Sequence, residues 1–283
     1  MRLSHCVTAL FLGLGVAVFS DTVQAQEHAE HGRARSIQPV QWSSLPLLQS
    51  QGRPGERGAV AFRVAGMPEA ELRVFAPESP GHSVLVDKQG DGWQLAALPG
   101  SQGGYHWLLA ERVESGKVLR AATIWSFPGK GSSPQGLLQT PLAGLDLRPV
   151  RVPDKGAFRE NSSWSFRVTW EGLPLPGQEV LLETENGSRQ RFVSGSDGVV
   201  DVRFPEDYPA DAIDPALGAA RTRKAYLLSV AHEHQGAQYL TTFSQFYTPA
   251  LLRERSLLWG AVFAGVGALL AVPLIRRREK KHA

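Results

Sequence analysis

Hydrophobic and polar residues alternate along much of the chain, and this period of two is typical of half-buried β-strands. Between Ala59 and Phe127 the alternation recurs in short stretches that are separated by turns containing Gly or Pro. Short strands at near-regular spacing are typical of a β-sandwich. We therefore predict a first β-sandwich domain over residues 59–128, with strands at Val60–Val64, Leu72–Ala76, Val84–Val86, Trp93–Ala97, Tyr105–Leu109 and Val118–Phe127.

A second set of strands follows residues 129–141, whose sequence GKGSSPQGLLQTP is typical of an interdomain linker. Its clearest strand is Ser163–Trp170, in which every second residue is aromatic or aliphatic. Two hairpins are predicted, one across Asn186-Gly187 and one across residues 235–237. These strands predict a second β-sandwich domain over residues 142–249.

The C-terminal region contains Ser256–Ile275, a run of about 20 uncharged residues, which is the length of a helix that crosses the hydrocarbon core of a bilayer. The basic cluster Arg276–Lys281 follows directly and favours a cytoplasmic C-terminus. We therefore predict a transmembrane helix over residues 256–275, a cytoplasmic tail over residues 276–283, and all earlier residues on the opposite side of the membrane.

The N-terminus has the pattern of a secretory signal peptide. Arg2 and His5 precede the apolar run Val7–Phe19, and small residues stand three and one positions before a cut after Ala25. A cut after Ser20 is the alternative. The single cysteine, Cys6, leaves with residues 1–25, so disulfides, cysteine zinc ligands and cysteine nucleophiles are excluded from the mature chain. Residues 26–58 are predicted to be a flexible, histidine-bearing segment.

Charge and motifs exclude two classes of function. The formal net charge is only +3, and acidic residues are dispersed among the basic ones, which argues against a nucleic-acid surface. No serine-nucleophile elbow, zinc-protease motif, phosphate-binding loop or dinucleotide fingerprint occurs. The sequence therefore does not predict an enzyme.

The histidines are the best candidates for a binding site. His232 and His234 are two residues apart in a predicted strand, so both imidazoles lie on one face near the hairpin turn, with Glu233 on the other face. Such a pair suits Zn, Ni or Cu, although a third ligand must come from elsewhere. The alternative is a pair of rim histidines that hydrogen-bond to loop carbonyls.

A second candidate metal site lies at the mature N-terminus, which begins Gln26-Glu27-His28 after a cut at Ala25. The free amine, two backbone amide nitrogens and the third-residue imidazole form the square-planar set that Cu(II) and Ni(II) favour. His31 adds a further contact or passes the ion on. The alternative is a polar tail with incidental histidines.

The acidic residues of the loop over residues 205–224 are interpreted as solvated, because they lack the alternating spacing of a calcium loop.

One part of the chain resembles a known family. Gly172-Leu173-Pro174-Leu175-Pro176-Gly177, the Asp197-Gly198 turn and Tyr226–His232 are similar to elements of the NikM-like family of periplasmic, immunoglobulin-like proteins associated with nickel and cobalt uptake. The resemblance covers roughly Leu145–Tyr247 and is weaker across the first domain.

Together with the strand pattern and the predicted anchor, the resemblance gives the expected fold class: all-β, with two immunoglobulin-like β-sandwich domains plus one C-terminal transmembrane helix. It also implies a single-pass protein of the bacterial inner membrane with periplasmic domains. The expected function is an accessory role in transition-metal uptake, in which the chain binds Ni(II), Co(II) or Cu(II) and presents it to a metal permease or another inner-membrane complex. The alternative is a metal-free, immunoglobulin-like interaction module that scaffolds a membrane complex.

Overall fold

The computed structural model describes residues 42–51, 58–99, 101, 104–129, 131–153, 158–209, 222–250 and 260–263. The chain divides into two units, Met1–Val40 and Gln41–Ala283, and every described residue belongs to the second. The predicted signal peptide over residues 1–25 and the predicted cytoplasmic tail over residues 276–283 lie outside the described residues.

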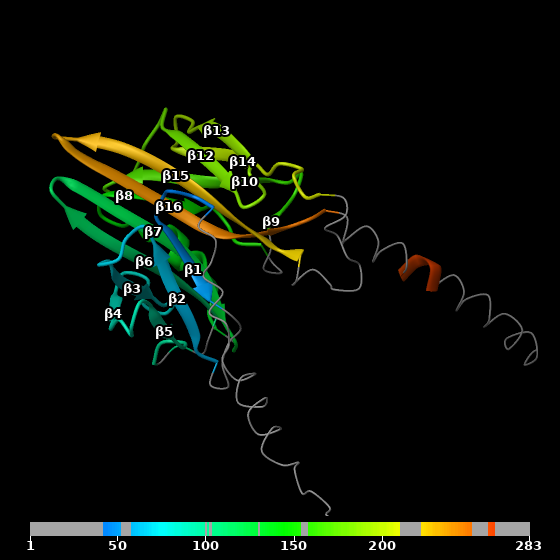
Figure 1. Ribbon diagram of the computed structural model, residues 1–283, viewed down its shortest axis with the longest axis horizontal. Coiled ribbons are helices and arrows are strands. Elements are labelled where there is room, and N and C mark those ends of the chain that lie inside the picture. Colours follow the sequence, from blue (N-terminus) through cyan, green and yellow to red (C-terminus); the bar gives the residue numbers. More distant parts are fainter. Residues whose placement is uncertain are drawn as a thin grey trace, which may run out of the picture. The chain divides into compact units, whose positions relative to one another are not determined.

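The largest sheet contains strands from both predicted domains. Its members are β3 (Glu71–Phe75), β4 (Ser83–Val86), β6 (Gly104–Glu114), β7 (Lys117–Phe127), β9 (Phe158–Arg159), β12 (Glu179–Thr184), β13 (Arg189–Val193), β15 (Lys224–His234) and β16 (Ala237–Thr248). Their order is β13-β12-β15-β16-β7-β6-β3-β4, with β9 beside the end of β16 (Figure 1). The two long hairpins β6–β7 and β15–β16 form the middle of this sheet.

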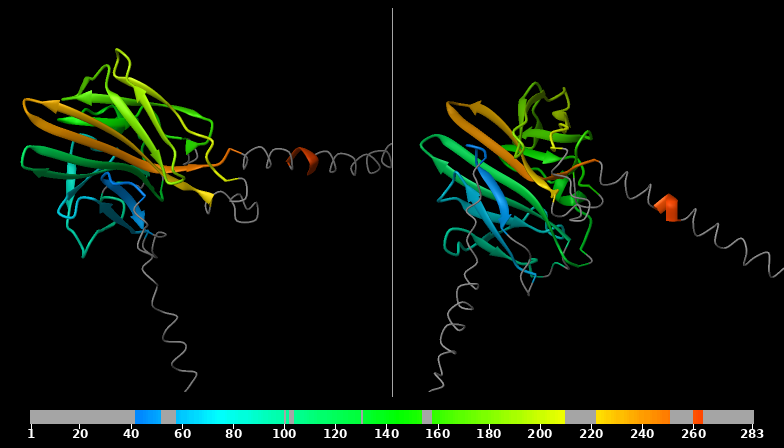
Figure 2. Two further views of the ribbon diagram at one scale, coloured as in Figure 1. Left: turned by 45° about the horizontal axis from the view of Figure 1, so that its top comes forward. Right: turned by 45° about the vertical axis from the view of Figure 1, so that its right-hand side comes forward.

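Two smaller sheets cover opposite faces of the large one (Figure 2). One consists of β1 (Leu47–Gln51), β2 (Val60–Ala65) and β5 (Trp93–Leu95), and the other of β8 (Leu145–Pro149), β10 (Ser163–Trp170), β11 (Leu173–Pro174) and β14 (Val199–Arg203). The alternation along β6 shows the two faces: Trp107 packs into the core that contains Phe166, whereas Leu108 packs into the core that contains Phe62. The predicted all-β sandwich architecture is confirmed.

The two predicted strand sets meet where β7 and β16 pair in parallel, with Ala122 opposite Phe243. Trp107 of the first set stacks on Phe243 of the second, with ring centroids 5.5 Å apart. The predicted linker contains a short helix, α2 (Gln135–Gln139), whose Leu137 and Leu138 are buried in the shared core. Separate folding of residues 59–128 and 142–249 stays a prediction, but in the described part they share one sheet and one core.

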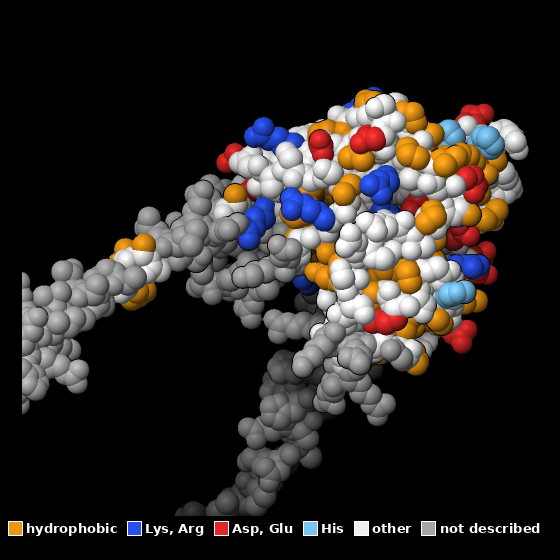
Figure 3. All heavy atoms as spheres, turned by 180° about the vertical axis from the view of Figure 1, so that it is seen from behind, with side chains coloured by type: hydrophobic (Ala, Val, Ile, Leu, Met, Phe, Trp, Pro, Cys, Tyr) orange, Lys and Arg blue, Asp and Glu red, His pale blue; other side chains and the backbone are white. Residues whose placement is uncertain are grey.

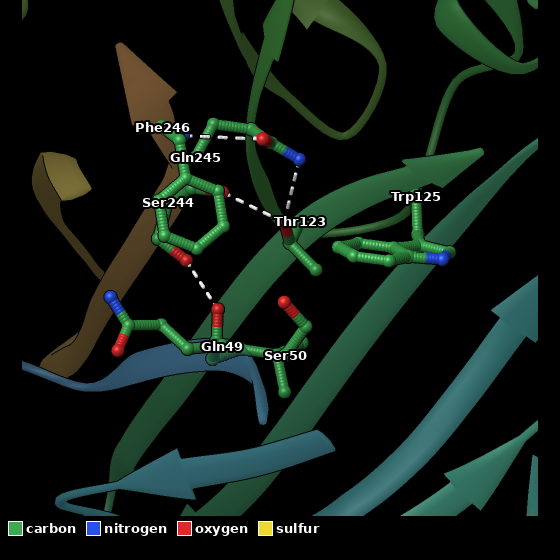
Figure 4. Close-up of a pocket in the computed structure, with 8 residues that line it drawn as sticks. Gln49, Ser50, Thr123, Trp125, Ser244, Gln245 and Phe246 are labelled. Atoms are coloured by element: carbon green, nitrogen blue, oxygen red, sulfur yellow. Dashed lines mark hydrogen bonds between the residues drawn. The ribbon is translucent and has the colours of Figure 1, made fainter. Parts of the chain in front are cut away.

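Residues 42–51 differ from the flexible segment that we predicted over residues 26–58. They include β1, and Leu48 is 1% exposed. The physical reason is that β1 pairs with β2 and is also held by residues almost 200 positions away: the hydroxyl of Thr242 donates to the carbonyl of Pro46 (2.7 Å), and that of Ser244 donates to the carbonyl of Leu48 (2.5 Å). Figure 4 shows the second of these contacts, from Ser244, among further polar contacts between β1, β7 and β16 around a cavity of about 10 Å³.

Little of the predicted transmembrane helix over residues 256–275 belongs to the described part. Residues 260–263 are described, and they are helical and exposed. Within the described residues, no helix combines the length and the apolar character that a membrane crossing requires.

Candidate functional site

The β15–β16 hairpin brings the two candidate histidines to its end. Gln235 and Gly236 have φ of 50° and 77°, the positive values that a tight two-residue hairpin turn requires. His232 and His234 lie just before this turn, on the face of β15 that also carries the buried Val230. The prediction that the two imidazoles share one face is therefore confirmed.

A tryptophan from another sheet lies against both imidazoles. Trp170 ends β10, where Glu171 and Gly172 (φ 50° and 78°) turn the chain into β11. Its ring centroid is 4.9 Å from that of His232 and 4.9 Å from that of His234, and the two imidazole centroids are 6.3 Å apart. Tyr239 contacts the indole edge-on at 4.6 Å. These four residues are called the hairpin-end cluster below.

Within the described part of the chain, no hydrogen bond involves an imidazole nitrogen of the hairpin-end cluster. His232 is partly buried and His234 is exposed. Neither ring makes a hydrogen bond to another residue of the described part, so the predicted alternative, bonds to loop carbonyls, has no support there. A neutral imidazole carries one donor and one acceptor nitrogen. The cluster therefore offers two nitrogen ligands that are held by ring contacts alone.

The surface beside the cluster is hollowed. A depression of about 510 Å³ lies between the tips of the two central hairpins, and its lining includes His232, Tyr239, Leu240, Lys117 and Glu233. Figure 3 shows histidine side chains at the molecular surface, next to hydrophobic and acidic ones. The cluster is accordingly open to an ion or a partner from solution.

The described residues do not complete a multidentate metal site. No group of three or more His, Cys, Asp or Glu side chains that could hold a metal ion occurs among them. The predicted N-terminal ligands Gln26, Glu27, His28 and His31 lie outside the described residues. Within the described part, the metal-binding potential of the histidines therefore rests on the two imidazoles of the hairpin-end cluster.

The acidic residues at the start of the loop over residues 205–224 have a structural role. The Asp207 carboxylate accepts hydrogen bonds from the hydroxyls of Tyr247 and Thr184, both at 2.6 Å. Burial, together with the carboxylate of Asp207, raises the pKa of Tyr247 well above its usual value. Asp211 and Asp214 of the same loop lie outside the described residues.

His106 shows what a histidine of this fold looks like when it is structural. It is 0% exposed, its Nδ1 contacts the carbonyl oxygen of Gly104 at 3.2 Å, and the backbone N–H of Leu98 donates to its Nε2 at 3.3 Å. The second bond makes Nε2 an acceptor, so Nδ1 carries the proton. Desolvation lowers the pKa of His106, which therefore favours the neutral ring.

A second tryptophan is associated with a cation that the chain itself supplies. The guanidinium of Arg148 lies over Trp107, 4.7 Å from the ring centroid, and its Nε is 2.6 Å from the Asp146 carboxylate. The same guanidinium donates to the carbonyls of Leu137 and, at 2.9 Å, Thr140. Burial raises the pKa of Asp146, although Arg148 opposes this. We call these three side chains, Arg148, Asp146 and Trp107, the buried arginine site.

Comparison with known proteins adds no assignment. No protein-family model and no curated protein sequence matches the chain. Similar solved structures include a 1.5-MDa bacterial ice-binding adhesin (15% identity, TM-score 0.24, 73% of this chain and 65% of that chain) and a Ca²⁺-stabilised ice-binding adhesin of an Antarctic bacterium (15%, 0.23, 72% and 48%). A segment of two fibronectin type III domains from chicken tenascin is also similar (12%, 0.21, 72% and 98%).

The chain thus spans about two thirds of the 1.5-MDa adhesin chain and about half of the Antarctic adhesin chain. TM-scores of 0.21 to 0.24 do not assign it to a family. The structure itself defines the class, an all-β protein of stacked sheets.

Sequence reasoning found the two histidines but missed their aromatic partners. Trp170 lies in a different sheet, and its approach to β15 depends on how the two sheets pack. The position of Trp170 in the sequence was the available signal. It belongs to the apolar face of an alternating strand but stands at the end of that strand, directly before a Glu-Gly turn, so its side chain lies at the rim of the core.

Proposed function

We propose that the chain is a membrane-anchored, periplasmic accessory protein of transition-metal uptake, which binds Ni(II), Co(II) or Cu(II) and presents the ion to a permease or another inner-membrane complex. The observation that carries this proposal is the pair of imidazoles, His232 and His234, whose nitrogens have no hydrogen-bond partner in the described part. Imidazole nitrogen is a ligand that suits these ions. The predicted anchor Ser256–Ile275 and the immunoglobulin-like character of both strand sets belong to the same proposal.

The position of the pair favours transfer over storage. His234 is exposed at the end of a hairpin, and the described residues supply no third side-chain ligand. An ion held there keeps open coordination positions, and a receiving protein can occupy these before the imidazoles leave. A closed four-ligand site, in contrast, is the arrangement of a structural metal.

The mature N-terminus provides the second part of the proposal. Gln26, Glu27 and His28 form a chelate of four nitrogens that selects Cu(II) and Ni(II), and His31 assists in passing the ion on. Capture by this segment and presentation by the hairpin-end cluster are separate functions, so each is testable without the other.

Equilibrium dialysis of the full mature chain, made without a histidine tag, tests the proposal. We expect bound Ni(II), Co(II) or Cu(II), with one ion lost in the His232→Ala/His234→Ala variant and another lost in His28→Ala. The exposed His82 is the matched control, because His82→Ala removes an imidazole from neither site. Retention of no ion by the wild-type chain would refute the proposal, as would unchanged stoichiometry in both variants.

A metal-free scaffold is the second candidate, and one observation favours it. β4 lies at an edge of the large sheet and exposes Val84 and Leu85, which are 47% and 57% accessible. An uncharged, apolar edge strand readily pairs with a strand of another chain. If this candidate is correct, a membrane complex co-purifies equally with metal-loaded and metal-free chain, and Leu85→Lys disrupts the complex while His232→Ala/His234→Ala does not.

A further inference from the structure

Three of the four rings of the hairpin-end cluster, those of His232, His234 and Trp170, lie around a position that fits one bare ion. Trp170 is equidistant from His232 and His234, at 4.9 Å, and the two imidazole planes are inclined by only 21°. A point midway between the imidazole centroids is about 3.2 Å from each and about 3.8 Å from the indole centroid, within the range at which a ring face attracts a cation.

The first of these distances matches coordination by nitrogen. A metal–nitrogen bond of about 2 Å, extended by the radius of an imidazole ring, places a metal about 3 Å from the ring centroid. The two rings are stacked, with planes inclined by 21°, and the χ2 torsion of histidine is broad, so rotation of each ring about χ2 is the movement that turns a nitrogen toward the midpoint. Two imidazoles on opposite sides of the ion then give a nearly linear pair of ligands.

The surroundings select the charge and the type of the ion. Within the described part no third His, Cys, Asp or Glu joins the pair, and Glu233 lies on the opposite face of β15. The third neighbour is the indole of Trp170, an aromatic ring whose face attracts positive charge but gives no lone pair. Divalent first-row ions favour four or more donor atoms, whereas Cu(I) and Ag(I), with a filled d shell and a single charge, are satisfied by two nitrogens.

The chain offers these soft ions few competing ligands. Its methionines are Met1 and Met67; the first belongs to the predicted signal peptide, and the second is 0% exposed. Its one cysteine, Cys6, belongs to that peptide as well. Soft sulfur ligands, which normally outcompete imidazole for Cu(I), are therefore absent from the accessible surface of the mature described part.

We propose that His232, His234 and Trp170 form a site for a monovalent d¹⁰ cation, Cu(I) or Ag(I), with the imidazoles as ligands and the indole as a cation–π partner. The role of this site in handing over metal rests on the proposed function, but the binding itself does not. Binding requires no electron transfer, because the ion enters and leaves in the same oxidation state.

Titration of the full mature chain with Ag(I), a redox-inert probe, tests the site. The chain carries His28→Ala and His31→Ala, so that the N-terminal histidines do not compete. We expect one tightly bound Ag(I) and a shift of the tryptophan ultraviolet absorption. Both are lost in His232→Ala/His234→Ala and retained in the control His82→Ala. Trp170→Leu should weaken binding by about 3- to 30-fold and abolish the absorption shift, and Trp170→Tyr should restore part of the affinity. Circular dichroism verifies that each variant is folded.

The outcomes separate this inference from the proposed function. If Ag(I) binds equally well to the chain and to Trp170→Leu, without an absorption shift, the cation–π contact is refuted. If divalent ions bind at His232 and His234 but Ag(I) and Cu(I) do not, this inference is wrong and the proposed function stands. If Ag(I) binds at the cluster and no divalent ion binds anywhere on the chain, the proposed function fails and the d¹⁰ site stands.

Discussion

Trp107 and Trp170 both lie beside basic side chains, and their surroundings differ in one decisive respect. Trp107 is 0% exposed and carries the guanidinium of Arg148, whose charge is paired with Asp146. Trp170 is partly exposed and carries two imidazoles whose nitrogens have no bond within the described part. At the buried arginine site the chain supplies its own cation, whereas at the hairpin-end cluster the corresponding position is open.

The difference teaches how to separate structure from function in a fold without a catalytic motif. The guanidinium of Arg148 has a structural role, because it connects β8 with the segment that contains α2 and with Trp107 of β6. Among the described residues, the hairpin-end cluster connects two sheets through ring contacts, and its imidazole nitrogens have no hydrogen-bond partner there. Substitutions at the two places should therefore affect different observables, stability at the first and ligand binding at the second.

The largest effect is expected at the buried arginine site. Arg148→Ala leaves the Asp146 carboxylate buried without its partner and the carbonyls of Leu137 and Thr140 without their donor, which costs about 3–5 kcal/mol of the free energy of unfolding. Urea denaturation measures this loss. The matched control is Arg191→Ala, which removes an exposed ion pair with Glu179 and should change stability by less than about 1 kcal/mol. Equal effects of the two variants would contradict the structural role of Arg148.

An intermediate effect should distinguish the two tryptophans directly. Trp107→Leu removes a fully buried ring and should cost about 2–3 kcal/mol, since it loses packing and the contact with Arg148. Trp170→Leu removes a partly exposed ring and should cost about 1 kcal/mol. Thermal or urea unfolding of the two variants, measured in metal-free buffer, gives the comparison. A Trp170→Leu variant that is as unstable as Trp107→Leu would show that the hairpin-end cluster is a core element.

The smallest effect is expected on the pH dependence of stability. The pKa of His106 is lowered from its usual value of 6.5 by burial, so the unfolded chain binds a proton more readily than the folded one. The stability that depends on neutral His106 is therefore fully present above about pH 6.5 and is lost as the pH falls below it. The free energy of unfolding between pH 8 and 5 should decline in the wild type and less steeply in His106→Asn. Parallel curves for the two chains would contradict this assignment.

Much of the local structure follows from the sequence. The period of two located most strands of both sets, and the Gln-Gly turn located the β15–β16 hairpin with its two histidines on one face. These features depend on residues that are close together in the sequence. The parallel pairing of β7 with β16 could not be predicted in this way, because it joins residues that are far apart in the sequence, such as Ala122 and Phe243.

Three further features of the structure could not be predicted from the local sequence. The Gly/Ser/Pro-rich residues 129–141 read as a linker, but Leu137 and Leu138 within them are anchored by the guanidinium of Arg148 and by burial. The run Leu45-Pro46-Leu47-Leu48 has no alternation, and its place is determined by pairing with β2 and by two distant hydroxyls. In the candidate site, the same limit applies to Trp170, which belongs to a different sheet from the histidines that it contacts.

The attachment of β1 also has a consequence for how the protein is made. Thr242 and Ser244, which hold Pro46 and Leu48, are each separated from these by 196 residues, so β1 cannot complete its contacts until β16 has been synthesised. Because chains emerge N-terminus first, β1 is the earliest described strand to appear; its partner β2 follows directly, whereas its contacts with β16 are among the last to form. Pairings over such distances also slow folding. Until the β15–β16 hairpin is made, the carbonyl groups of Pro46 and Leu48 therefore lack the hydroxyl donors that they have in the folded protein.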